Sequence, residues 1–99
     1  MFGFDLPVWI IDKDGFIVSA SIDKYGRCLL LFTDEDLATT AIEEFDLAGG
    51  RPQRIEDDDT LKLVLTSVRD GGDEYAGIDV SVKRSLGIFE KIDALLEKL

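Results

Sequence analysis

The sequence predicts an α+β domain in which about three helices pack on a mixed β-sheet. Two observations indicate this class. Apolar runs of strand length cluster in the first third of the chain, and segments with helical spacing follow them. Strands that precede helices in this way favour separate layers of sheet and helix. The chain has 99 residues, which suits one domain with its own core, so residues 1–99 are expected to form a single domain.

A three-stranded meander is expected first. The apolar run Val8–Ile11 is followed by a polar turn and then by an apolar–polar alternation over Phe16–Ile22. Asp14-Gly15 lies between these runs and is a strong signal for a two-residue hairpin turn, because both central residues of that turn need positive φ. A second turn at 23–26 leads into the strand of residues 27–32.

This third strand and the helix after it are the clearest local signal in the chain. Five consecutive apolar residues, Cys28–Phe32, predict a central strand that is buried on both faces. Thr33 is expected to be the helix N-cap, its hydroxyl accepting a hydrogen bond from the backbone N–H of Asp36. The helix is predicted from about Asp34 to Asp46, with an apolar stripe of Leu37, Ala38, Ala41, Ile42 and Phe45.

The middle of the chain is predicted to form an edge strand and a second helix. The segment Pro52–Ile55 suits a short edge strand or an extended connector, since proline in a sheet is tolerated only at such places. Asp58 or Asp59 is expected to cap the helix, because aspartate is a preferred N-cap residue. The inner stripe of this helix is Leu61, Val64, Leu65 and Val68.

The C-terminal third is expected to supply one more strand and one more helix. The strand covers Tyr75–Val82, with Ile78, Val80 and Val82 predicted on one face. Ser85 is expected to cap the last helix, whose apolar ladder is Ile88, Ile92, Leu95 and Leu99. The predicted order of elements is therefore β-β-β-α-(β)-α-β-α.

The net charge and the cysteine content limit the class of partner and the cellular compartment that we expect. The net charge of −10 disfavours binding to nucleic acid and to anionic membrane surfaces. Cys28 is the single cysteine, so no internal disulfide is expected, and its place in an apolar strand predicts a buried, inert thiol. The N-terminus lacks a basic leader and no window suits a membrane span, so we expect a cytoplasmic protein without a membrane partner.

Catalytic motifs are not found in the sequence. The chain contains no histidine and no Ser-His, Cys-His or Gly-rich phosphate motif. We therefore predict that the protein is not an enzyme and that it uses no cofactor. An enzyme that uses paired carboxylates is the most distant alternative.

Two aspartate-containing segments are candidate cation sites. Asp12-Lys13-Asp14-Gly15 resembles the middle of an EF-hand loop, but alignment on Gly15 puts Ile10 and Ser21 at the first and last ligand positions. A hairpin turn is therefore the better interpretation. The run Asp57–Asp59, preceded by Glu56, contains enough carboxylates to hold a hard cation, but it also suits the amino end of a helix.

Most of the negative charge lies in one quarter of the chain. Residues 34–59 contain ten acidic residues against Arg51 and Arg54. Such a concentration either steers a basic partner or forms a solvated helix face. The candidate interaction residues are Asp34, Glu35, Glu43, Glu44, Asp46, Asp57 and Asp58.

Several segments together are similar to SseB N-terminal-like domains. They are the opening Pro-Val-Trp-Ile strand, the stretch LLLFTDEDLA of residues 29–38, the helix segment LKLVL and a late Gly-Ile-Asp strand. The resemblance covers roughly residues 7–96. It implies a small bacterial α+β domain without assigned catalysis, and it supplies no catalytic residues and no secretion role.

The sequence thus predicts a non-catalytic cytoplasmic domain that binds another protein. Its binding surface is expected to be the acidic segment or the C-terminal helix, and that helix is also a candidate homodimer contact. The alternative is a small-ligand or cation-binding domain that uses Asp12, Asp14 or Asp57–Asp59.

Overall fold

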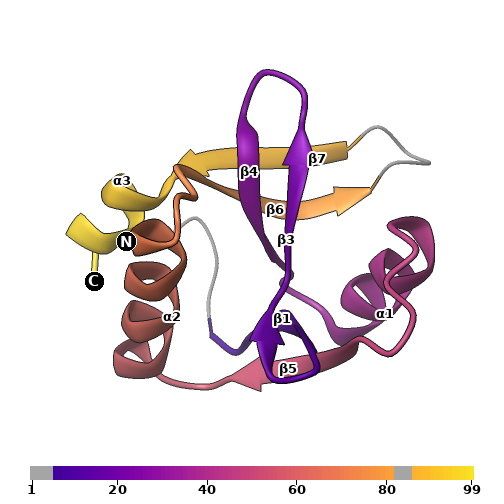
Figure 1. The fold of residues 1–99 in the computed structure, drawn as a ribbon. Coiled ribbons are helices and arrows are strands. Elements are labelled where there is room, and N and C mark those ends of the chain that lie inside the picture. Colours follow the sequence, from indigo (N-terminus) through magenta and orange to yellow (C-terminus); the bar gives the residue numbers. More distant parts are fainter. Residues whose placement is uncertain (1–5, 82–85) are drawn as a thin grey trace.

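Two hairpins near the amino terminus start two different sheets (Figure 1). The structure, a computed structural model, describes residues 6–81 and 86–99. The first sheet has the order β2-β1-β5 and consists of β1 (Val8–Lys13), β2 (Phe16–Ile17) and β5 (Arg51–Ile55). The second has the order β3-β4-β6-β7 and consists of β3 (Ser19–Ile22), β4 (Gly26–Leu31), β6 (Tyr75–Ser81) and β7 (Leu86–Lys91). Strands β4 and β6 run parallel, whereas the other paired strands run antiparallel.

Three helices complete the domain and confirm the predicted α+β class. They are α1 (Glu35–Glu44), α2 (Asp58–Asp70) and α3 (Ile92–Glu97). Within the described parts of the chain, none of the helices combines the length and the apolar character that crossing a membrane requires.

The single mixed sheet that the sequence predicts is divided at Val18. The strand expected over 16–22 pairs with β1 as far as Val18, whose N–H donates to the Ile11 carbonyl at 2.9 Å. From Ser19 onward the same segment pairs with β4. The meander is therefore two hairpins that share one bent segment. Two backbone hydrogen bonds of 2.8 Å between Trp9 and Phe32 connect β1 to the end of β4, so the two sheets still meet.

The turn between β1 and β2 has the predicted form. Asp14 has φ 54° and Gly15 has φ 83°, so both central residues are in the left-handed region. This is the geometry of a type I′ turn, whose twist matches the twist of the flanking strands.

Strand β4 is buried on both faces, as its sequence predicts. Leu29 and Leu31 belong to one core, which α2 and α3 cover, and Leu30 and Phe32 belong to a second core beneath α1. Figure 1 shows α1 and α2 on opposite sides of the molecule, so each helix closes one face of this strand.

The N-caps predicted for α1 and α2 are each wrong by one residue or more. Asp34 caps α1, since its carboxylate accepts the N–H of Asp36 at 2.8 Å. Thr33 instead donates its N–H and its hydroxyl to the carboxylate of Asp79, at 2.8 and 2.7 Å. Asp57 caps α2 in place of Asp58 or Asp59. Sequence reasoning chose wrongly because adjacent polar residues in each segment are all acceptable caps.

The side chains of β6 do not alternate regularly between the two faces of the sheet along the whole strand. Ile78 belongs to the first core and Val80 to the second, because Asp79 has φ 54° and the pairing with β7 shifts register between Ile78 and Ser81. The expectation that these two residues share a face is therefore wrong, and Val82 lies outside the described residues. A bulge of this kind turns the following side chain to the other face.

The C-terminal segment forms a strand and a short helix where one long helix was expected. Ile88 pairs with Ile78 in the sheet and is 62% exposed, so it does not belong to a helical ladder. Phe89 lies over Gly77, and its ring stacks on Tyr25 with centroids 4.0 Å apart. Pairing with β6 and these ring contacts override the helical spacing of the apolar residues. Ser85, the expected cap, lies outside the described residues.

A pair of alanine variants tests the turn. Gly15→Ala places a Cβ in the left-handed region, so we expect a loss of about 1 kcal/mol in the free energy of unfolding. No heavy atom lies within 4 Å of the new Cβ, so the loss reports backbone strain alone. Gly71→Ala is the control, because Gly71 has φ −80° and its new Cβ meets ordinary contacts. Equal urea-unfolding midpoints for the two variants would contradict the turn assignment.

Candidate functional site

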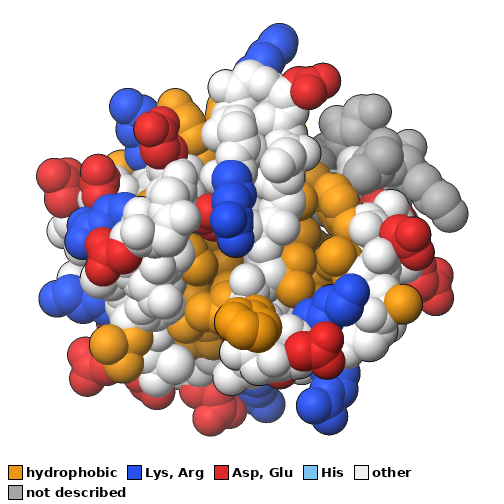
Figure 2. All heavy atoms as spheres, in the orientation of Figure 1, with side chains coloured by type: hydrophobic (Ala, Val, Ile, Leu, Met, Phe, Trp, Pro, Cys, Tyr) orange, Lys and Arg blue, Asp and Glu red, His pale blue; other side chains and the backbone are white. Residues whose placement is uncertain are grey.

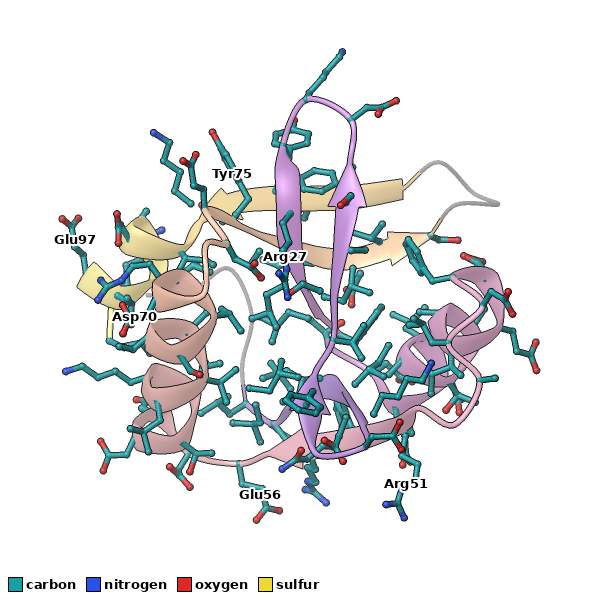
Figure 3. The ribbon with its side chains drawn as sticks, in the orientation of Figure 1. Arg27, Arg51, Glu56, Asp70, Tyr75 and Glu97 are labelled. Atoms are coloured by element: carbon teal, nitrogen blue, oxygen red, sulfur yellow. The ribbon has the colours of Figure 1, made fainter. Side chains whose placement is uncertain are left out.

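The predicted acidic segment does not form one continuous surface. Helix α1 and the amino end of α2, which carry these acids, lie on opposite sides of the molecule (Figure 1). Strand β5 runs between them and carries Arg51 and Arg54. Figure 3 shows Arg51 and Glu56 near the two ends of β5, both pointing away from the domain. The seven candidate residues therefore fall into two groups that one small partner segment does not reach together.

The first group belongs to α1 and contains residues with different roles. Asp34 is the N-cap. Glu44 is half-buried, and each of its carboxylate oxygens accepts the Ser81 hydroxyl at 3.1 Å, so it helps to hold α1 against β6. Four acids on α1 and just after it are exposed and form no ion pair with any residue in 6–81 or 86–99. These four residues, here named the α1 acidic surface, are Glu35, Asp36, Glu43 and Asp46.

The carboxyl end of α1 is electrostatically unfavourable. Glu35 and Asp36 lie in the first turn, where the positive end of the helix dipole stabilises them. Glu43 lies in the last turn, which contains no basic residue, and Asp46 follows with φ 55°. The negative end of the dipole repels both carboxylates, and a left-handed residue after a helix is most often glycine. The helix dipole therefore does not stabilise the acids at this end.

The second group caps α2. The carboxylate of Asp57 accepts the N–H of Thr60 at 2.7 Å, and this hydrogen bond lowers the pKa of Asp57. Asp58 and Asp59 lie in the first turn, at the positive end of the dipole. These three acids therefore contribute to helix stability.

The candidate cation sites show no assembled ligand set. Asp14 lies in the tight β1–β2 turn, and Asp12 lies in β1, in register with Ile17. Across 6–81 and 86–99, no three His, Cys, Asp or Glu side chains come together in a way that could hold a metal ion.

Sequence reasoning missed a buried carboxylate. Asp73 follows α2 and is 2% exposed. Its carboxylate accepts a short hydrogen bond from the Ser19 hydroxyl, and its other oxygen lies 3.2 Å from Nε of Arg27. Arg27 projects from β4 near the middle of the view in Figure 3. The two contacts join the β3–β4 hairpin to the loop that precedes β6.

No local pattern distinguishes Asp73 from a solvated loop residue. It follows Gly71-Gly72, a pair that suits the end of a helix, and aspartate is rarely buried. Its partners lie 54 and 46 residues away in the chain, so only the folded structure brings them together. A hollow of about 410 Å³ opens beside it and is lined in part by Phe16, Ile17, Ser67 and Val68.

The cysteine is buried, as expected. Cys28 is fully buried in β4, burial raises the pKa of its thiol, and the negative charge of Asp73 raises it further. The thiol is therefore protonated at neutral pH and is a poor nucleophile.

No model of a known protein family and no curated protein matches this chain. The similarity to SseB N-terminal-like domains therefore stays a prediction from the sequence.

The cap of α2 has a testable pH dependence. The pKa of Asp57 is lower in the folded protein than in the unfolded chain, so its stabilising effect is present above the unfolded value of 3.8. That effect disappears as the pH falls through the folded pKa. We expect Asp57→Ala to lower Tm at pH 7, and we expect the difference from the parent protein to shrink as the pH is lowered below 3.8, as measured by circular dichroism. Asp58→Ala, one residue along the chain, is the control, and it should lower Tm less at pH 7. Equal losses of Tm in the two variants would contradict the cap assignment.

The Asp73 contacts predict a large effect of substitution. Asp73→Ala leaves the Ser19 hydroxyl without its acceptor and removes the ion pair, so we expect a loss of about 1–3 kcal/mol in the free energy of unfolding. Asp70→Ala is the control, because the Asp70 side chain is 70% exposed and its ion pair with Arg69 spans 3.7 Å. Exposed pairs contribute about 0–1 kcal/mol. Similar unfolding free energies for the two variants would show that Asp73 does not join the hairpin to the loop.

Proposed function

We propose that this chain is a non-catalytic protein-interaction domain that binds a basic partner through the α1 acidic surface. One observation carries the proposal. Glu43 and Asp46 are exposed and unpaired among the described residues, and they lie where the helix dipole opposes them. Charged residues in positions that the local electrostatic field disfavours are expected at functional sites.

The remaining features support binding in preference to catalysis. The sequence contains no histidine, the Cys28 thiol is buried and protonated, and the Asp73 carboxylate already has two partners. A net charge of −10 creates an attractive field for a cationic protein. Such a field raises the rate of encounter and weakens as salt is added.

Charge neutralisation on α1 tests the proposal. The variant is Glu35→Gln with Glu43→Gln and Asp46→Asn, which removes three charges and leaves the half-buried Glu44 in place. For a partner captured from lysate and then purified, we expect the association rate at low salt to fall severalfold in stopped-flow measurements. Added salt should slow the parent protein toward the variant. The variant should be at least as stable as the parent, because two of the removed charges lie at the unfavourable end of the helix.

The control removes three charges elsewhere, through Asp58→Asn, Asp59→Asn and Glu97→Gln. Glu97 lies on α3, on the other side of the molecule from α1 (Figure 3). A general effect of net charge would slow the control and the α1 variant equally. That result would contradict a binding site on α1.

A further inference from the structure

The hollow beside Asp73 has the size and the composition of a small-molecule site. Its volume is about 410 Å³, and its described lining comes from the β1–β2 hairpin, the β3–β4 hairpin and the carboxyl end of α2. Figure 2 shows apolar side chains at the surface between α2 and the β3–β4 hairpin. Pockets of this size that combine apolar walls with a few polar groups are typical of ligand sites.

The apolar part of the lining includes an exposed aromatic residue. Phe16 is 75% exposed and follows the β1–β2 turn, and Ile17 and Val68 line the same hollow. A single exposed apolar side chain is common on protein surfaces, but here three of them surround one concavity. An apolar ligand that covers them removes this surface from water, which favours binding.

The charged part of the lining is a single ion pair. Arg27 and Asp73 are the only charged residues among the described lining residues, and Nε of Arg27 lies 3.2 Å from the Asp73 carboxylate. The other N–H donors of a guanidinium group are on its two terminal nitrogens. The Arg27 side chain is 62% exposed, and no other acid in 6–81 or 86–99 forms an ion pair with it.

The buried carboxylate holds the guanidinium group at the edge of the hollow. Asp73 is 2% exposed, and its second oxygen accepts the Ser19 hydroxyl, so both oxygens have partners. Burial of an ion pair contributes little net stability, because removing the charges from water offsets their attraction. The same arrangement restricts the direction of Arg27. Binding sites use such supporting residues to position the group that meets the ligand.

The charges of the hollow favour a ligand with one negative charge. The terminal nitrogens of arginine match the two oxygens of a carboxylate, to which they can donate parallel hydrogen bonds. A ligand with two negative charges is repelled more strongly by Asp73 and by the net charge of −10. A cation is not favoured, because both oxygens of the buried Asp73 carboxylate already have partners.

We propose that this hollow binds a small free carboxylic acid with an apolar body. Its carboxylate accepts hydrogen bonds from the terminal nitrogens of Arg27, and its body packs on Phe16 and Val68. The carboxyl terminus of a protein has the same head group, but its backbone amides also need partners. Besides the ion pair, the described lining offers only the side chains of Ser19 and Ser67 as polar groups, which favours the free acid.

Titration with hydrocinnamate tests the site in the unchanged protein. We expect saturable changes in the NMR shifts of the backbone amides of Phe16, Arg27 and Val68, and no changes in α1. Hydrocinnamamide has the same shape without the charge, and acetate has the charge without the apolar body. Each should bind at least about tenfold more weakly than hydrocinnamate. Equal affinities for hydrocinnamate and its amide would overturn the proposal.

Two arginine variants test the charged part of the lining. Arg27→Gln removes the donors of the guanidinium group and should weaken hydrocinnamate binding at least about tenfold. Arg51→Gln is the control, because Arg51 is exposed on β5 and points away from the domain (Figure 3). Its affinity should equal that of the parent protein. An unchanged affinity in Arg27→Gln would overturn the proposal.

Two alanine variants test the apolar part, and they decide the question if Arg27→Gln does not fold. Phe16→Ala removes an exposed side chain from the lining and should weaken hydrocinnamate binding about fivefold or more. Leu63→Ala is the control, since Leu63 is 73% exposed and is not among the described lining residues. Equal affinities in the two variants would show that the ligand does not contact this hollow.

A peptide and the neutralised α1 variant complete the test. Acetyl-glycyl-phenylalanine with a free carboxyl terminus represents a protein end, and tighter binding of this peptide than of hydrocinnamate would overturn the assignment to a free acid. The variant with Glu35→Gln, Glu43→Gln and Asp46→Asn should bind hydrocinnamate like the parent protein, because α1 and α2 lie on opposite sides of the molecule. Loss of hydrocinnamate binding in that variant would overturn a site at this hollow.

Discussion

Burial of β4 on both faces is the constraint on which the rest of the structure depends. Its leucines alternate between two cores, so a helix must lie on each side of the strand. Helix α1 supplies one cover directly after the strand, and α2 supplies the other after the chain has crossed along β5. The hydrogen bonds between Trp9 and Phe32 then join the first sheet to the end of the same strand. Apolar burial of this kind is the main favourable term in folding.

Two aspartates reinforce this arrangement from loops and strands. Asp79 accepts both donors of Thr33 and so holds the start of α1 against β6. Asp73 joins the β3–β4 hairpin to the loop after α2. Asp73 is buried and Asp79 is half-buried, and carboxylates removed from water need donors to replace it. In both places the donors come from distant parts of the chain.

The exposed acids of the two helices differ from one another in their effect on stability. Those at the amino ends of α1 and α2 are favoured by the helix dipoles, and Asp34 and Asp57 also cap the helices. Glu43 and Asp46 have no such support. This contrast between the two ends of one helix separates acids that the helix dipole stabilises from acids that it does not.

The sequence by itself determined the features that depend on neighbours along the chain. Asp14-Gly15 specified its turn, because the φ angles of a two-residue hairpin are a local requirement. The run Cys28–Phe32 specified a doubly buried strand, and the stripes of α1 and α2 specified their inner faces. Pro52 correctly indicated an edge strand.

Only the tertiary structure decided the features that depend on distant residues. The spacing of Ile88 and Ile92 suits a helix, but pairing with β6 makes residues 86–91 a strand. Thr33 suits an N-cap, but Asp79 takes its donors. The burial of Asp73 has no signature in the sequence. These hydrogen bonds and strand pairs depend on how the chain closes its core, and the spacing of residues within one segment carries no information about that closure.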